Sequence, residues 1–153
     1  MIHLPDLLRA PGLSTDELRS NFLVQGLFKR GEINLRHIDL DRVVLGGAVP
    51  LHAPLRIDPP PSLAAAFFAE RRELGILNIG ETGSITVDGV RHAMCRRDML
   101  YVGRGNRDIR LASDDADRPA RFYIVSYPAH ATHPTTRVAR SSAIATELGA
   151  SDT

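Results

Sequence analysis

The chain has 153 residues, of which 43% are hydrophobic and 24% are charged, enough for one soluble globular domain with a sizeable core. Its formal net charge of +1, with no basic block, argues against a dedicated nucleic-acid-binding protein. The longest apolar run, residues 63–69, is far too short to span a bilayer, so we expect no membrane partner.

The cysteine count and the amino terminus bear on the compartment. Cys95 is the only cysteine, which rules out an internal disulfide and favours a reducing environment. Asp6 and Arg9 interrupt the apolar core that a signal peptide needs, so we expect a cytoplasmic protein. Lys29 is the only lysine among 19 basic residues. Arginine suits bidentate capture of carboxylates, although coding bias toward arginine in a GC-rich genome is the plainer explanation.

The first predicted element is a short helix. Ser14 and Glu17 have the spacing of a capping box, in which the serine hydroxyl caps the helix start and the glutamate reaches back. This pattern predicts a helix from about Thr15 to Asn21. We assign residues 1–21 to an N-terminal arm that contains this helix.

From Phe22 onward the pattern changes to short β segments separated by turn residues, which is typical of an antiparallel sandwich or barrel. The predicted strands cover residues 22–28, 33–38, 42–49, 64–70, 74–79, 84–87, 91–95, 99–102, 107–112 and 120–127. The three prolines at 59–61 cannot join a sheet ladder and predict a rigid connector. We assign residues 22–128 to the barrel. Residues 129–153, which show no β pattern, are assigned to a C-terminal linker or tail.

The centre of the chain is the stretch from Glu70 to Gly89. Alternating apolar residues, the glycines at 80 and 83 and the Asp88-Gly89 pair predict a hairpin of half-buried strands. Glu73 is followed by six residues and then Gly80, which resembles the end of the first sequence motif of cupin barrels. The fold class predicted is therefore all-β, a cupin-like antiparallel barrel or sandwich with a short N-terminal helix.

The positions where metal-binding cupins carry ligands are empty in this sequence. The His-x-His pair that precedes the glutamate in such cupins would fall on Phe67 and Ala69, or on Ala66 and Phe68, depending on the gap. The second motif resembles residues 103–105 followed by Asp108, where a histidine would stand. A lone pair of carboxylates does not supply the three or four ligands of a transition metal, so we expect no metal in this chain.

A set of longer strings resembles one family, the 5-keto-4-deoxyuronate isomerases (4-deoxy-L-threo-5-hexosulose-uronate ketol-isomerases) of pectin and uronate breakdown. The matching residues are 21–24, 37–39, 41–42, 46–47, 70–89, 97–98, 100–103, 119–123, 128–130, 132, 134 and 135. They run in order over about 115 residues, and ERRELG followed by NIG is a specific string.

The resemblance implies two cupin barrel halves per subunit, a hexameric assembly and a small sugar-acid substrate. It also implies an aldose–ketose isomerisation between 5-dehydro-4-deoxy-D-glucuronate and 3-deoxy-D-glycero-2,5-hexodiulosonate. Such a reaction removes a proton beside a carbonyl and returns it elsewhere, and a divalent metal can polarise that carbonyl. In the family, zinc is held by three histidines and a glutamate in the second half of a chain nearly twice this length.

The present sequence ends before that second half, so we expect it to be an N-terminal domain that is inactive alone. It would self-associate or pair with a separate C-terminal half, because surface meant for that half would be exposed as a large apolar patch. The alternative is a non-catalytic cupin module for sugar-acid binding or oligomer scaffolding. A continuation with His-x-His and a following glutamate would favour the enzyme.

Two groups of residues are candidates for the substrate pocket or an interface. Arg71, Arg72 and Glu73, beside Glu70, suit either a carboxylate-binding fork or a structural ion-pair network. Strand alternation places Arg71 and Glu73 on one face, and Glu70 and Arg72 on the other.

His130 lies three residues before His133, and of this pair the resemblance covers only His130, although a loop histidine is more often a surface residue. His37 is more plausibly a strand or interface residue than a base. No catalytic residue is assigned.

Overall fold

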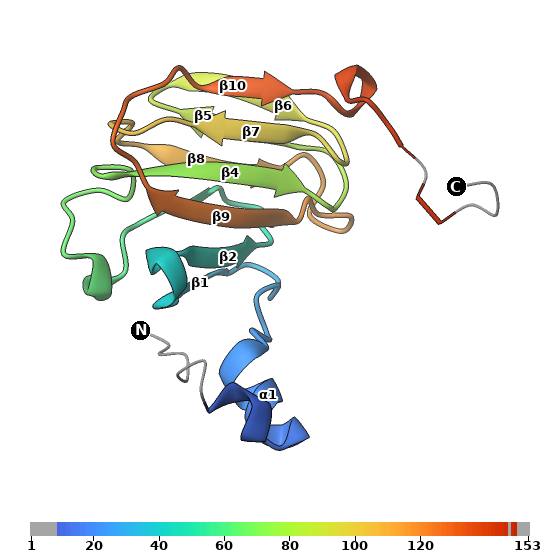
Figure 1. The fold of residues 1–153 in the computed structure, drawn as a ribbon. Helices are drawn as coiled ribbons and strands as arrows, with labels where there is room; N and C mark the ends of the chain where they lie inside the picture. Colours follow the sequence, from blue (N-terminus) through green and yellow to red (C-terminus); the bar gives the residue numbers. More distant parts are fainter. Residues whose placement is uncertain (1–8, 147, 150–153) are drawn as a thin grey trace.

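The computed structural model describes residues 9–146, 148 and 149. Two antiparallel sheets face each other in a cupin-like barrel (Figure 1). The six-stranded sheet has the order β1 (Ile33–His37), β2 (Val44–Ala48), β9 (Phe122–Pro128), β4 (Arg72–Asn78), β7 (Met99–Val102) and β10 (Thr136–Val138). The four-stranded sheet has the order β3 (Leu55–Arg56), β8 (Ile109–Ser113), β5 (Gly83–Val87) and β6 (Val90–Met94). The predicted fold class is confirmed.

The single α-helix of the described residues, α1 (Thr15–Phe22), lies apart from the sheets (Figure 1). It begins at the predicted capping box: the Ser14 hydroxyl accepts a hydrogen bond from the Glu17 backbone N–H, and the Glu17 carboxylate accepts from the Ser14 backbone N–H. No helix in the described part of the chain has the length and apolar character needed to cross a membrane. Residues 1–8 of the predicted arm, and 147 and 150–153 of the predicted tail, lie outside the described residues.

The core fills the space between the sheets, because alternate residues of each strand point inward. In β4, burial alternates strictly along the strand, and Leu74 and Ile76 are almost fully buried. Phe122 and Ile124 of β9 face them from the neighbouring strand, and Phe68 closes the core from a loop. The inward face of β4 is apolar in its middle and polar at both ends, where Arg72 and Asn78 are buried.

Two predicted strands do not form. Residues 23–29 leave α1 without joining a ladder, and the 64–70 run folds into turns after Ala64, which adopts a left-handed backbone (φ 45°). The apolar character of that run arises because Phe68 and Ala69 are buried in the core.

Two strands were not predicted. β3 and β10 are two and three residues long, and β10 lies in the region that the sequence predicted to be free of strands. It pairs with β7 and is held by Asp98, whose buried carboxylate accepts bonds from the Arg137 guanidinium (2.6 Å) and the Arg140 backbone N–H (2.9 Å).

The hairpin predicted for residues 70–89 is also wrong in one respect. β4 and β5 form, but they belong to different sheets, so the segment between them is a crossover and not a tight turn. Gly80 and Gly83 are needed for close packing, because a Cβ on Gly80 would lie 2.3 Å from the Arg121 backbone nitrogen. The Asp88-Gly89 turn does form, and it joins β5 to β6.

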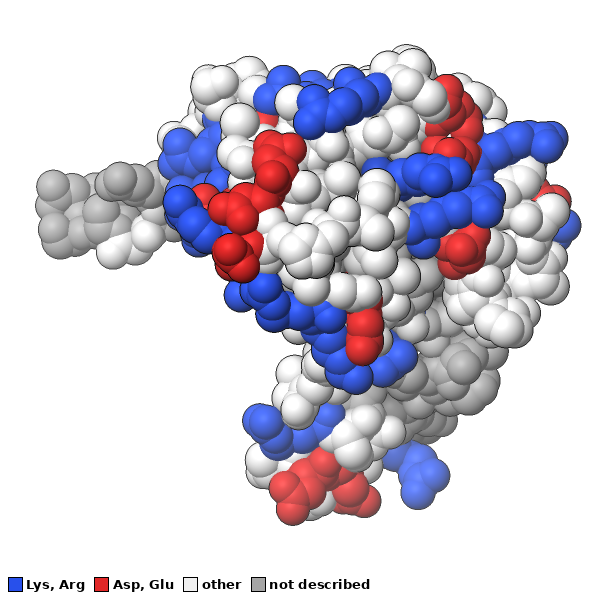
Figure 2. Space-filling view, turned by 180° about the vertical axis from the view of Figure 1, so that it is seen from behind, with Lys and Arg blue, Asp and Glu red and all other residues white. Residues whose placement is uncertain are grey.

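The outer faces of the two sheets differ in chemistry. On the four-stranded sheet, arginines and aspartates interleave (Figure 2), with ion pairs such as Arg110–Asp108 at 2.8 Å and Arg91–Asp114 at 3.4 Å. The outward residues of the six-stranded sheet are largely apolar or aromatic. They include Leu45, Leu77, Met99, Tyr101, Tyr123, Val125 and Tyr127.

Candidate functional site

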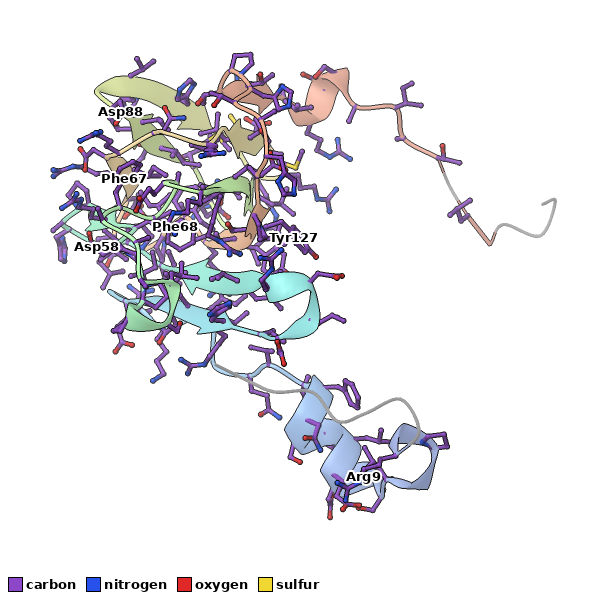
Figure 3. All side chains as sticks on the ribbon, turned by 60° about the vertical axis from the view of Figure 1, so that its left-hand side comes forward. Arg9, Asp58, Phe67, Phe68, Asp88 and Tyr127 are labelled. Carbon is purple, nitrogen blue, oxygen red and sulfur yellow. The ribbon has the colours of Figure 1, made fainter. Side chains whose placement is uncertain are left out.

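A cavity of about 250 Å³ opens at the end of the barrel where β4 begins. Five segments line it: the end of β1, the turn after it, the loop around residues 62–68, the start of β4 and the end of β9. The lining residues are His37, Arg42, Ser62, Leu63, Ala65, Phe68, Arg71, Arg72 and Pro128. Phe68, only 1% exposed, lies within the body of the barrel (Figure 3) and gives the cavity an apolar wall.

Arg72 is the buried charge of this cavity, with 6% of its surface exposed. Its Nε donates to the Ser126 hydroxyl (3.1 Å), and its Nη2 donates to the backbone carbonyls of Ser126 (2.8 Å) and Arg42 (2.6 Å). Nη1 has no hydrogen-bond partner among the described residues, which leaves its two N–H groups for a ligand. Burial, and then the neighbouring Arg42 charge, lower the pKa of Arg72, although an arginine remains charged at neutral pH.

The Arg42 carbonyl, which accepts a hydrogen bond from Arg72, lies in a turn whose backbone adopts the left-handed region. Asp41 and Arg42 both have positive φ, 48° and 54°, in the turn between β1 and β2. Such conformations are costly for residues other than glycine and persist where surrounding contacts fix them. Here the bond from Arg72 to the Arg42 carbonyl provides such a contact and brings a second arginine to the cavity.

His37 supplies the only imidazole among the described residues that line the cavity. Its Nδ1 lies 3.1 Å from the Ser62 hydroxyl, and its Nε2 is buried without a hydrogen-bond partner among the described residues. Burial, followed by the positive charge of Arg72, lowers the pKa of His37, while Asp39 opposes this effect. The lowered pKa favours the neutral imidazole, whose Nε2 has no partner among the described residues and can bond a ligand.

The charge of the lining selects an anion. Among the described residues, three arginines and no carboxylate line the cavity, and Leu63, Ala65 and Phe68 provide apolar contact. A carboxylate on a small polar molecule matches these groups, since guanidinium–carboxylate hydrogen bonds are charge-assisted and planar.

A divalent metal does not fit the same cavity, because one imidazole among three cations is a poor ligand set. Across the described residues, no group of three or more histidine, cysteine, aspartate or glutamate side chains is placed to hold a metal ion.

The structure separates the predicted candidate residues. Arg72 and Arg71 both line the cavity; Arg71 stands at its rim just before β4, with its side chain 68% exposed, and pairs with Glu70 at 3.4 Å. Glu73 points to the opposite face of the sheet, where its carboxylate accepts a hydrogen bond from the Tyr101 hydroxyl at 2.7 Å. Burial and this bond raise the pKa of Tyr101 to about 12.

The remaining candidate, His130, is exposed and is not among the described residues that line this cavity. His133 lies beside Arg104 and Asn106 in a separate open pocket. Arg42 and Ser62 were not candidates from sequence, because no motif or spacing links them to β4. Whether Arg71, Arg72, Glu73 or His130 touches substrate stays a prediction.

Comparison with known proteins finds strong sequence relatives. The chain is 47% identical over 139 residues to a 4-deoxy-L-threo-5-hexosulose-uronate ketol-isomerase of Formosa agariphila, which covers 91% of this chain and 50% of that protein. It is 46% identical over 136 residues to the enzyme of the same name from Halalkalibacterium halodurans, covering 89% and 49% respectively. The chain is therefore homologous to these isomerases and spans about half the length of the curated relatives it matches.

The other comparisons are weaker. No family model matches the chain. Among solved structures, the cupin domain of a transcriptional regulator from Enterobacter cloacae is 10% identical, covers 65% of this chain and 97% of that one, and has a TM-score of 0.49.

Proposed function

We propose that this chain, homologous over about half their length to 4-deoxy-L-threo-5-hexosulose-uronate ketol-isomerases, is the N-terminal domain of such an enzyme. The observation that carries the proposal is the identity of 43% to 47% over more than four fifths of the chain to several enzymes of that name. The reaction would interconvert 5-dehydro-4-deoxy-D-glucuronate and 3-deoxy-D-glycero-2,5-hexodiulosonate.

Within such an enzyme, the contribution of this domain would be to bind the substrate's carboxylate. The free Nη1 of Arg72 would donate to it, Arg42 and Arg71 would neutralise its charge, and Phe68 and Leu63 would contact the carbon chain. The neutral His37 would bond a substrate hydroxyl or carbonyl through Nε2. Such contacts orient a flexible sugar acid for a proton transfer.

The zinc implied by the resemblance would belong to the other half, because the cavity described above does not suit a metal. We therefore propose that this chain alone does not turn over substrate. The apolar outer face of the six-stranded sheet supports association with a second half or another copy.

The alternative function is a non-catalytic module for sugar-acid binding or oligomer scaffolding. The cavity itself favours it, since its described residues offer groups that bind a carboxylate but only His37 as a group that can exchange a proton near neutral pH.

Two measurements test the proposal and separate it from the alternative. Calorimetric titration should show binding of D-glucuronate, a stable uronate probe, and none of D-glucose, which has the same size without the charge. An isomerase assay should show no turnover by the chain with added zinc, and turnover when the unmatched half of the Formosa agariphila relative is supplied.

The outcomes are distinct. Uronate binding with no turnover in the mixture would favour the non-catalytic module. Equal affinity for D-glucose and D-glucuronate would refute the proposal that the cavity binds a carboxylate. Turnover by the chain alone would show that its own residues complete an active site.

A further inference from the structure

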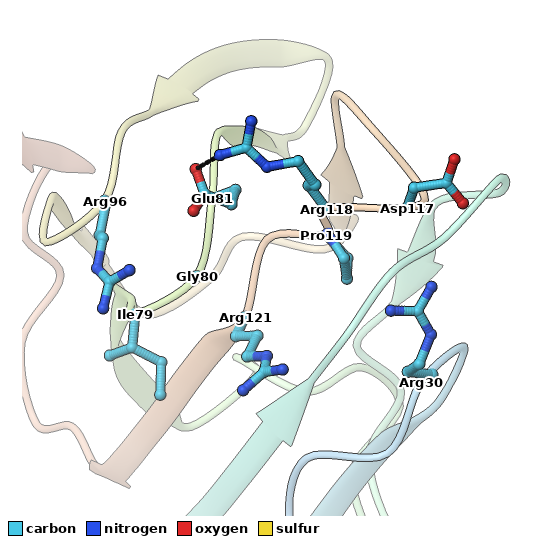
Figure 4. Close-up of a pocket in the computed structure, with 9 residues that line it drawn as sticks. All are labelled: Arg30, Ile79, Gly80, Glu81, Arg96, Asp117, Arg118, Pro119 and Arg121. Carbon is cyan, nitrogen blue, oxygen red and sulfur yellow. Dashed lines mark ion pairs between the residues drawn. The ribbon is translucent and has the colours of Figure 1, made fainter.

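A second arginine-lined cavity, of about 360 Å³, opens at the opposite end of β4 from the one already described. Its lining residues are Arg30, Ile79, Gly80, Glu81, Arg96, Asp117, Arg118, Pro119 and Arg121 (Figure 4). Four arginines thus face two carboxylates, and the cavity shares no residue with the Arg72 cavity.

The two carboxylates do not neutralise all four arginines. Arg118 forms an ion pair with Glu81 at 3.2 Å, and Arg30 donates from Nη2 to the Ala116 carbonyl at 2.8 Å. The guanidinium groups of Arg96 and Arg121 have no hydrogen-bond or ion-pair partner within the described part of the chain. Two complete sets of guanidinium donors are therefore available to a ligand in this cavity.

The floor of the cavity is rigid, because the buried side chain of Asn78 ties together the segments that carry the charged residues. Its amide nitrogen donates to the carbonyls of Glu81 (2.7 Å) and Met94 (3.0 Å). Its amide oxygen accepts from the backbone N–H groups of Gly80 (3.0 Å) and Arg121 (3.3 Å). Both donors and both lone pairs of the amide are thus used within the protein.

The backbone of Asn78 extends the same frame to the turn that carries Arg96. Its carbonyl accepts from the Arg97 backbone N–H (2.6 Å), and its N–H donates to the Asp98 carbonyl (3.0 Å). In the view of Figure 4, Arg96 lies on one side of the Ile79–Glu81 segment, and Arg118 and Arg121 lie on the other. The unpaired arginines therefore project from backbone that is fixed on both sides of the opening.

We propose that this cavity is a binding site for a small multiply charged oxyanion, of which a phosphate group is the simplest member. Two unpaired guanidiniums and a net positive lining suit the charge and the several acceptor oxygens of such a group. The concave shape and modest volume suit a small molecule better than a flat macromolecular surface. The ligand could be free phosphate or the phosphate of a sugar monoester, which share this chemistry.

The test is an isothermal titration with inorganic phosphate and, separately, with glucose 6-phosphate, at low ionic strength and constant pH. We compare the wild-type chain with the double variant R96A/R121A, which removes the two unpaired guanidiniums. The matched control is R36A/R91A, which removes two exposed arginines that are not among the described lining residues of this cavity or of the Arg72 cavity. Circular dichroism confirms that each variant is folded.

We expect saturable anion binding that weakens roughly tenfold or more in R96A/R121A and changes little in R36A/R91A, since each lost charge-assisted contact is costly. Tighter binding of glucose 6-phosphate would favour a monoester as the ligand, and tighter binding of inorganic phosphate would favour free phosphate. Absence of saturable binding, or equal weakening in both variants, would overturn the proposal. Binding of D-glucuronate to R96A/R121A should match that of the wild type, so failure at this cavity is distinguishable from failure at the Arg72 cavity.

Discussion

The two ends of β4 place a buried polar side chain on the same inward face, but the two side chains are used differently. Arg72 satisfies three carbonyl or hydroxyl acceptors and keeps Nη1 for the cavity beside it. Asn78 is 0% exposed, and both the amide nitrogen and the amide oxygen of its side chain form all their hydrogen bonds with backbone groups of the protein. A buried polar group can thus offer contacts to a ligand or fix the backbone around one, and the count of unused donors distinguishes the two roles.

The comparison predicts that Asn78→Ala destabilises the fold more than any change at Arg72. The variant removes the side-chain bonds to two backbone N–H groups and two carbonyls at a closely packed crossover, which we expect to cost about 3–4 kcal/mol in the free energy of unfolding. Urea denaturation followed by circular dichroism measures it. Asn34→Ala is the matched control, because the Asn34 amide makes only a long, 3.5 Å bond to the Glu32 carboxylate. Equal losses in the two variants would refute the structural role of Asn78.

The second prediction concerns Arg72→Met, which keeps an unbranched side chain and removes the guanidinium. If Nη1 serves the ligand, D-glucuronate binding should weaken roughly tenfold or more, because a charge-assisted bond to the carboxylate is lost. The unfolding free energy should change less than in Asn78→Ala, because removal of a buried charge offsets part of the lost hydrogen bonding.

Calorimetry and urea denaturation of the same samples give both values. Arg71→Ala, which removes an exposed arginine at the rim, should weaken binding less than Arg72→Met does. Unchanged affinity in Arg72→Met would show that the cavity is not the uronate site.

The periodicity of β4 predicted part of this arrangement. Alternation correctly separated Arg72 from Glu73, because it depends only on local strand geometry. The alternation did not show which of these two residues points into the barrel. It also did not show that Arg71, which lies outside the strand, lines the same cavity as Arg72. The meeting of His37, Arg42 and Ser62 with Arg72 depends on sheet order, which local patterns do not determine.

Errors in the predicted strands have the same origin. The apolar residues of the 64–70 run predict a strand. In the structure this run is a loop, and its Phe68 and Ala69 are buried in the core. β10 was missed because all three of its residues are exposed and show no alternation; it is held by Asp98, 39 positions before Arg137. Pairings of that kind carry no local signal.

The smallest predicted effect is a pH dependence of stability that originates at the Arg72 end of β4. Burial and Arg72 lower the pKa of His37 in the folded state below its ordinary value of about 6.5. Between that value and the folded pKa, the unfolded chain binds more protons than the folded one, so stability should fall as the pH decreases through this window. Urea denaturation at closely spaced pH values measures the slope.

Three variants test whether that slope originates at the cavity. His37→Gln should flatten it while keeping a group able to bond Ser62, whereas His130→Gln, at an exposed imidazole outside the cavity, should keep the wild-type slope. Arg72→Met should make the slope shallower without abolishing it, because the charge contribution disappears and the burial contribution remains. A slope that is unchanged in His37→Gln would mean that other groups titrate in this range, and the neutral imidazole would then lose its support.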